Sequence, residues 1–157
     1  MMQNKFLAFF FWLLVPLLIG GVSGFATASS INGWFRALVK PSFNPPNWIF
    51  GPMWTTLYIL MGISAFVIWN TPVTKIRGQA LTLFWVQLTL NFCWSFLFFY
   101  FRQIGFALIE IGLMWVSILS MILAFRQVSP IAAWMNLPYL AWVSFASVLN
   151  FALWKLN

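Results

Sequence analysis

The chain has 157 residues, of which 63% are hydrophobic, 21% aromatic and only 6% charged, and its mean hydropathy is +0.93. Soluble domains carry roughly 25% charged residues, so this composition excludes a water-covered globular protein and predicts a membrane protein with several spans. The net charge of +7 comes from basic residues scattered between hydrophobic runs. That pattern favours anchors to lipid phosphates rather than nucleic-acid binding, with pairing to ligand carboxylates as a second interpretation.

The residue types that most enzymes and metal sites use are nearly missing from the sequence. It has no histidine, one cysteine, Cys93, and one acidic residue, Glu110. Neither a disulfide within the chain nor a hydrolytic triad can be assembled from this set. The sequence therefore predicts no metal site and no required cofactor.

The first hydrophobic run covers residues 6–28. At 1.5 Å per residue a helix of this length measures roughly 33 Å, enough to cross a bilayer. A secretory signal with a cleavage site at Ala26-Thr27-Ala28 is the alternative interpretation. Gly20, Gly24 and Ala28 form a small-xxx-small ridge, which predicts close approach of another helix, within the chain rather than in a dimer.

Residues 29–47 form the long polar connection, a predicted lid loop rich in proline and tryptophan. Residues 34–39 favour a short interfacial helix that ends before Pro41, because the residue preceding proline avoids helical geometry. Pro45 and Pro46 predict an extended, stiff segment.

Four further spans are predicted, at residues 48–69, 79–101, 104–125 and 131–154, the last with a kink at Pro138. We therefore expect an all-α membrane protein in which residues 1–157 form one bundle of five transmembrane helices. An odd number of spans places the termini on opposite sides. The basic residues divide equally between the two sides, so they do not set the orientation.

Polar residues mark one face of the third predicted span. Gln87, Asn91 and Ser95 recur at four-residue spacing and should point into the bundle. Two roles are compatible with this face: it can form hydrogen bonds between helices, or it can form the wall of a pocket. Glu110, in the fourth span, is either a functional acid or a structural group, as the partner of Arg102 or as a protonated, hydrogen-bonded carboxyl.

Tryptophans within the spans, Trp85, Trp94, Trp115 and Trp142, exceed what an interfacial belt requires. Most can serve as belt or core residues. The functional interpretation is that they form an aromatic cavity, which binds a flat hydrophobic ligand by stacking.

Several motifs together are recognisable. Trp34-Phe35 is followed by KPSFNPPNWIFGPMWTTLYILMG from Lys40 to Gly62, by Gln87 to Ser95, by Ser129-Pro130 and by Leu137-Pro-Tyr-Leu-Ala-Trp142. In order and spacing these blocks resemble the translocator protein family, also called the tryptophan-rich sensory protein or peripheral benzodiazepine receptor family. The resemblance covers essentially the whole chain.

The resemblance implies a homodimer of five-helix bundles, with a ligand cavity under the first loop. The short N-terminus, without a targeting extension, favours a bacterial cell membrane. The resemblance also implies binding of porphyrins such as protoporphyrin IX, involved in transport, sensing or disposal. The alternatives are a light- and oxygen-dependent porphyrin-degrading enzyme, in which Trp54 and Trp142 would act, or a sterol- or benzodiazepine-binding receptor without transport. The ligand-binding positions carried over are Trp34, Phe35, Pro45, Pro46, Trp54, Asn91, Trp94, Trp142 and Ser147.

Three positions depart from the family pattern. Phe35 replaces a frequent tyrosine and lacks its hydroxyl donor, and Glu110 stands where many members have aspartate. Phe151 occupies the place of the tyrosine in the sterol motif near the C-terminus. We therefore expect porphyrin binding to persist and sterol binding to be weakened.

Overall fold

The computed structural model describes residues 4–157 and is all-α, with no strand in that range. Five of its helical segments are long and apolar enough to cross a membrane, which confirms the predicted fold class. The helices are α1 (Lys5–Ile31), α2 (Trp34–Ala37), α3 (Phe50–Trp69), α4 (Lys75–Ser95), α5 (Ile104–Val128), α6 (Pro130–Trp134) and α7 (Leu137–Leu156). A short 3₁₀ turn, Asn47–Ile49, precedes α3, and a π-helical turn, Phe96–Tyr100, extends α4.

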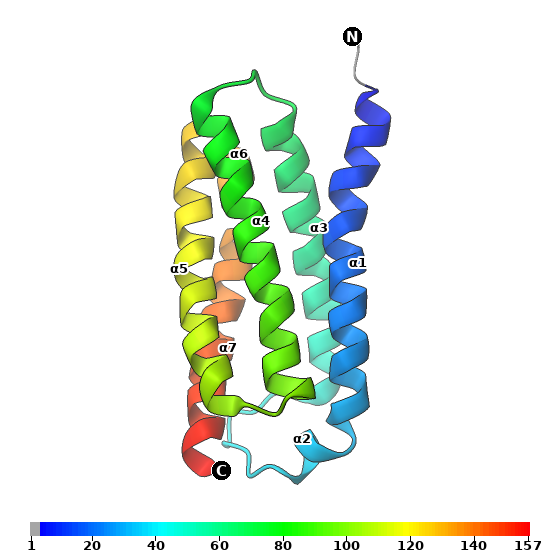
Figure 1. Ribbon diagram of the computed structural model, residues 1–157, viewed down its shortest axis with the longest axis vertical. Helices are drawn as coiled ribbons and strands as arrows, with labels where there is room; N and C mark the ends of the chain where they lie inside the picture. The colour runs from blue at the N-terminus through cyan, green and yellow to red at the C-terminus, as the bar shows by residue number, and fades with distance from the viewer. Residues whose placement is uncertain (1–3) are drawn as a thin grey trace.

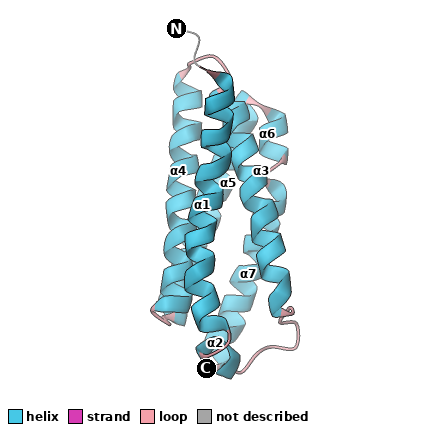
Figure 2. Cartoon of the chain, turned by 90° about the vertical axis from the view of Figure 1, so that its right-hand side faces the viewer, coloured by secondary structure: helices cyan, strands magenta, loops and turns pink. Residues whose placement is uncertain are grey.

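The long helices stand roughly parallel in one bundle, with the described N-terminal end at one pole and the C-terminus at the other (Figure 1). This arrangement agrees with an odd number of crossings. Helix α2 and the loop that follows it lie at the C-terminal pole, beneath the ends of α1 and α3 (Figures 1 and 2). The predicted lid loop therefore covers one end of the bundle.

Local capping explains why α4 begins at Lys75 rather than near residue 79. The Thr74 side chain accepts a hydrogen bond of 3.2 Å from the Arg77 N–H and so caps the first turn. At the other end the helix does not stop at a cap but widens into the π-helical turn. The Ser30 hydroxyl of α1 donates a 2.7 Å hydrogen bond to the Phe99 carbonyl of this turn.

The last span is broken rather than merely kinked. Helix α6 ends at Trp134 and α7 starts at Leu137, with Pro138 in the first turn of α7, where its missing N–H is tolerated. The Asn136 amide stabilises the break, because it donates 2.8 Å hydrogen bonds to the Ala132 carbonyl and the Ser64 hydroxyl.

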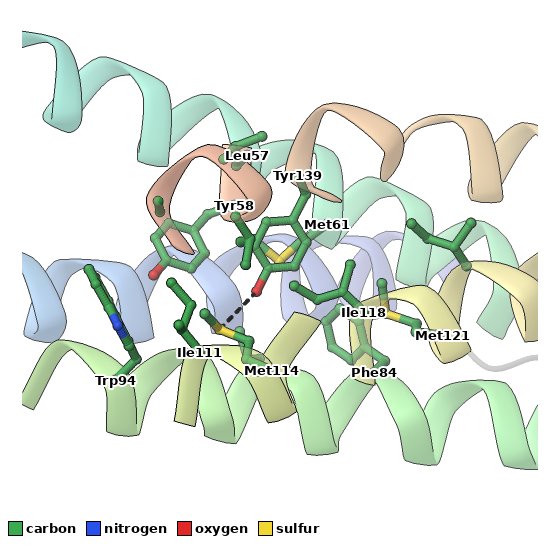
Figure 3. Close-up of a cluster of buried hydrophobic side chains, with 14 of the residues drawn as sticks. Leu57, Tyr58, Met61, Phe84, Trp94, Ile111, Met114, Ile118, Met121 and Tyr139 are labelled. Atoms are coloured by element: carbon green, nitrogen blue, oxygen red, sulfur yellow. Dashed lines mark hydrogen bonds between the residues drawn. The ribbon is translucent and has the colours of Figure 1, made fainter. Parts of the chain in front are cut away.

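The interior of the bundle is marked by polar residues as much as by apolar ones. Gln87, Asn91 and Ser95 are 0%, 1% and 8% exposed, which confirms the predicted inward face. Large apolar side chains lie on both the inside and the outside, because lipid is as apolar as the core. Figure 3 shows the centre of the core, where Tyr139 of α7 donates a long hydrogen bond to the Met114 sulfur of α5.

Helices α1 and α3 touch in their upper halves and separate toward the lid (Figure 2). At the point of contact, a Cβ added to Gly62 would lie 2.7 Å from the Trp12 carbonyl oxygen and 2.8 Å from the Leu13 Cα. Glycine alone fits so close a backbone approach. Nearer the lid, the separation of the two helices leaves space for a cavity.

Candidate functional site

Two cavities lie side by side in the half of the bundle nearest the lid. The larger, which we call the groove, has a volume of about 520 Å³ and is bounded by α1, α3 and the end of α4. The smaller, the inner cavity, measures about 30 Å³ and lies toward α7. Ligand sites commonly occupy 300–1,000 Å³, and 30 Å³ is about the volume of one water molecule. Of these two cavities, the groove has room for a ligand of drug size and the inner cavity does not.

Small residues of α1 form one wall of the groove. Gly21, Gly24 and Ala28 are exposed, and a Cβ added at either glycine would meet nothing within 4 Å. Gly20 differs, because its Cβ would overlap the Tyr58 ring of α3. The predicted close approach at the small-xxx-small ridge therefore occurs at Gly20 alone, while the rest of the ridge leaves the groove open.

Aromatic side chains separate the groove from the inner cavity. Phe50, Trp54, Trp94 and Phe99 line both spaces. Trp94 is fixed, since its Nε1 donates a 3.2 Å hydrogen bond to Asn150 and its ring stacks on Phe98 at 5.3 Å. Trp54 stacks on Tyr58 at 5.7 Å and meets Trp142 edge to face at 6.5 Å. The four residues that line both cavities, Phe50, Trp54, Trp94 and Phe99, are called the aromatic partition below.

Each cavity contains a buried polar atom without a protein partner. The Ser23 hydroxyl lines the groove from a side chain that is 4% exposed, and among the described residues it makes no hydrogen bond. In the inner cavity the Trp142 Nε1 is also buried without an acceptor. Buried donors are normally satisfied, so these two atoms can each hydrogen-bond an acceptor carried by a ligand.

The lid loop is attached to the bundle at several points. Phe35 is 3% exposed and packs on Phe98 and Phe99, with ring centroids 6.1 and 5.6 Å away. The Asn157 side chain accepts a 3.0 Å hydrogen bond from the Val39 N–H and donates one of 3.1 Å to the Val39 carbonyl. The Lys40 ammonium donates to the carbonyls of Arg36 and Leu38 and lies 5.0 Å from the centre of the Phe35 ring.

The residues predicted to bind ligand fall into three groups. Phe35, Trp54, Trp94 and Trp142 line the inner cavity, and Trp54 and Trp94 line the groove as well. Trp34, Pro45 and Pro46 belong to the lid, where Trp34 is half-buried against Phe98 at 5.8 Å.

The third group, Asn91 and Ser147, lines neither cavity. Asn91 accepts a hydrogen bond of 2.5 Å from the Tyr58 hydroxyl and donates one of 3.1 Å to the Tyr139 hydroxyl. The Ser147 hydroxyl donates to the Val143 carbonyl of its own helix at 2.7 Å. Asn91 therefore makes hydrogen bonds between helices, whereas Ser95 of the same face lines the groove, so each of the two interpretations left open for this face applies to one of its residues.

Sequence reasoning missed the contribution of α1. Ser23 and Thr27, with the glycines around them, provide much of the groove wall. Their four-residue spacing in a glycine-rich half-span is the signal in the sequence, but it predicts helix packing as readily as a cavity. Tyr58, which also lines the groove, was missed because an isolated tyrosine in a span has no distinctive pattern.

Glu110 lies apart from both cavities. Its side chain is 8% exposed, and its two carboxyl oxygens have no hydrogen-bond partner among the described residues. Arg102, the suggested partner, is exposed and forms no ion pair within that range. The residue is therefore a buried acidic group outside the candidate site.

Comparison with known proteins identifies close relatives along nearly the entire chain. A family model described as the TspO/MBR family matches residues 12–155. The "Tryptophan-rich protein TspO" of Archaeoglobus fulgidus is 39% identical over 145 residues, covering 92% of this chain and 94% of the relative. The human "Translocator protein" is 40% identical over 126 residues, covering 79% and 75%. The "Tryptophan-rich sensory protein" of Cereibacter sphaeroides is 32% identical, covering 93% and 92%.

Proposed function

The chain belongs to the TspO/MBR family of multi-pass membrane proteins, and from this premise we propose that it binds porphyrins within the bilayer and takes part in their transport, sensing or disposal. The observation that carries the proposal is the groove of about 520 Å³ whose inner wall is the aromatic partition. A flat macrocycle has the shape and the apolar faces that such a wall binds by stacking. The words translocator and sensory in the relatives' names describe those proteins and agree with this choice.

Each part of a porphyrin would have a matching group on the protein. The Trp54 and Trp94 indoles would stack on the ring, and the Ser23 hydroxyl and Trp142 Nε1 would donate to polar atoms of the ligand. The guanidinium of Arg36, exposed in α2, makes no hydrogen bond or ion pair with other described residues and would meet the propionates. Lys40 is less suited to this role because its ammonium already binds two backbone carbonyls.

Titration with protoporphyrin IX in detergent tests the proposal. Saturable quenching of tryptophan fluorescence, with a matching shift of the porphyrin absorption band, is expected for the wild type. Removing both indoles with Trp54→Ala and Trp142→Ala should weaken binding by roughly 5- to 150-fold, because each aromatic pair contributes about 0.5–1.5 kcal/mol beyond its buried area. Trp134→Ala is the matched control, since Trp134 is 70% exposed and lines neither cavity. Unchanged affinity in the double variant would exclude this pocket.

A second candidate function is light-dependent porphyrin breakdown, favoured by the direct contact between the Trp54 and Trp142 rings at the inner cavity. The two indoles would react with oxidants that an illuminated porphyrin generates from oxygen. Loss of porphyrin absorption under light should then slow in Trp54→Phe and Trp142→Phe relative to the wild type. Equal loss in all three proteins would assign the breakdown to the porphyrin alone. The homodimer and the bacterial cell membrane stay predictions.

A further inference from the structure

One side of the groove opens along α1, within the membrane span. Gly21, Gly24 and Ala28, which line it, lie inside the first membrane span and are exposed. Between and beside them, Val22 and Phe25 are 52% and 80% exposed, so this side of α1 contacts acyl chains. A hydrophobic molecule dissolved in the bilayer can therefore reach the groove without crossing a polar layer.

The lid is joined to the bundle by several contacts. Phe35 is buried against the end of α4, and Phe43 contacts the Phe145 ring of α7 at 6.4 Å. The Asn157 side chain binds both backbone polar groups of Val39. These contacts join the lid to α4 and to α7, so access from the water requires several of them to break together.

From these observations we propose that ligands enter and leave sideways, from the bilayer through the gap between α1 and α3, and that Trp54 is the movable part of the aromatic partition. The proposal rests on the proposed function, because it describes the route by which the same ligand reaches its site. The Ser23 hydroxyl, buried and unpartnered in the groove, provides a hydrogen-bond donor for a polar atom of the entering ligand.

We assign the movement to the Trp54 ring because Trp94, the other tryptophan of the aromatic partition, is held in place. Trp94 is fixed by its hydrogen bond to Asn150 and by stacking on Phe98. Trp54 is half-buried, and its indole makes no hydrogen bond with the described residues. Since the inner cavity measures about 30 Å³, a macrocycle gains access to Trp142 when the Trp54 ring turns aside.

The experiment compares binding rates of protoporphyrin IX to the full chain in lipid nanodiscs, followed by stopped-flow tryptophan quenching. Gly21→Leu places a side chain in the open groove without displacing a neighbour, since a Cβ there meets nothing within 4 Å. We expect its association rate constant to fall by about tenfold, because the added side chain narrows the gap through which the ligand enters. Gly24→Leu provides a second groove variant with the same expected result.

Two controls separate the lateral route from the alternatives. Gly112→Leu is matched to Gly21→Leu, because Gly112 is also an exposed glycine in a span with an open Cβ position, but it does not line the groove. Its rates should equal those of the wild type. Asn157→Ala, which loosens the lid, should also leave the association rate constant unchanged.

The possible results distinguish failure of the route from failure of the function. Saturable binding with the same rates in Gly21→Leu, Gly24→Leu and wild type would overturn the lateral route and leave porphyrin binding intact. Faster rates in Asn157→Ala would overturn it in favour of entry beneath the lid. A wild type that shows no saturable quenching would remove the proposed function and this inference with it.

Discussion

The Tyr58 hydroxyl of α3 donates a 2.5 Å hydrogen bond to the side-chain oxygen of Asn91 on α4. The amide of the same Asn91 donates to the Tyr139 hydroxyl of α7 at 3.1 Å, and Tyr139 donates to the Met114 sulfur of α5. One asparagine thus links three helices directly and a fourth through Tyr139, just beyond the groove. Tyr58 also lines the groove and stacks on Trp54, so this network positions one wall of the site.

Removing the centre of this network should destabilise the bundle. Asn91→Ala leaves the Tyr58 and Tyr139 hydroxyls without their partner, and we expect a loss of about 1–3 kcal/mol in the free energy of unfolding. Denaturant titration in mixed micelles, followed by circular dichroism, measures the change. Ser120→Ala is the control, because its hydroxyl bonds only the Val116 carbonyl of its own helix. A loss in Asn91→Ala no larger than in the control would contradict the structural role of the network.

Two tryptophans provide a matched test of the unpartnered indole in the inner cavity. Trp142→Phe removes an Nε1 that makes no protein hydrogen bond, so we expect stability to be retained and protoporphyrin affinity to fall by about 3- to 10-fold. Trp115→Phe breaks a 2.8 Å hydrogen bond to Ser144 and lies outside both cavities. It should lower the melting temperature and leave affinity unchanged. The same response in both variants would show that Trp142 has no separate role in binding.

The contact between α1 and α3 predicts a position-dependent effect of adding one methyl group. Gly62→Ala forces the backbone of α1 away, and overpacking of this kind destabilises proteins by about 1–3 kcal/mol. Gly112→Ala, with an open Cβ position in α5, should be neutral or stabilising by up to about 1 kcal/mol, because alanine favours helix. Thermal unfolding of the two variants measures the difference, and equal stabilities would disprove the close approach.

The last residue should control the exchange of one amide in the lid. Asn157→Ala removes the acceptor of the Val39 N–H, and loss of a hydrogen bond of about 1 kcal/mol corresponds to roughly fivefold faster hydrogen exchange. The amide of Asn44, which bonds the Pro41 carbonyl within the same loop, is an internal reference and should not change. Hydrogen–deuterium exchange resolved by NMR gives both rates. Equal exchange of Val39 in variant and wild type would mean that Asn157 does not hold the lid.

The sequence by itself determined the all-α membrane fold, the approximate spans and the inward face of α4. These features are local, because a chain in hydrocarbon must satisfy its backbone hydrogen bonds within each helix and must turn its polar side chains inward. Gln87, Asn91 and Ser95 are buried as their spacing predicts. The motifs around Trp34, Trp54 and Trp142 also carried the family resemblance, because the order and spacing of motifs can be compared without knowing how the helices pack.

Only the tertiary structure decided how these helices divide the space between them. Apolar side chains face both lipid and core, so hydropathy does not tell which tryptophans line a cavity. Gly20 and Gly24 follow the same sequence pattern, yet one contacts Tyr58 and the other borders open space. Asn91 binds two tyrosines instead of lining either cavity. The reason is that each of these outcomes depends on contacts between residues distant in the chain, such as the approach of α1 to α3 at Gly20 and their separation at Gly24.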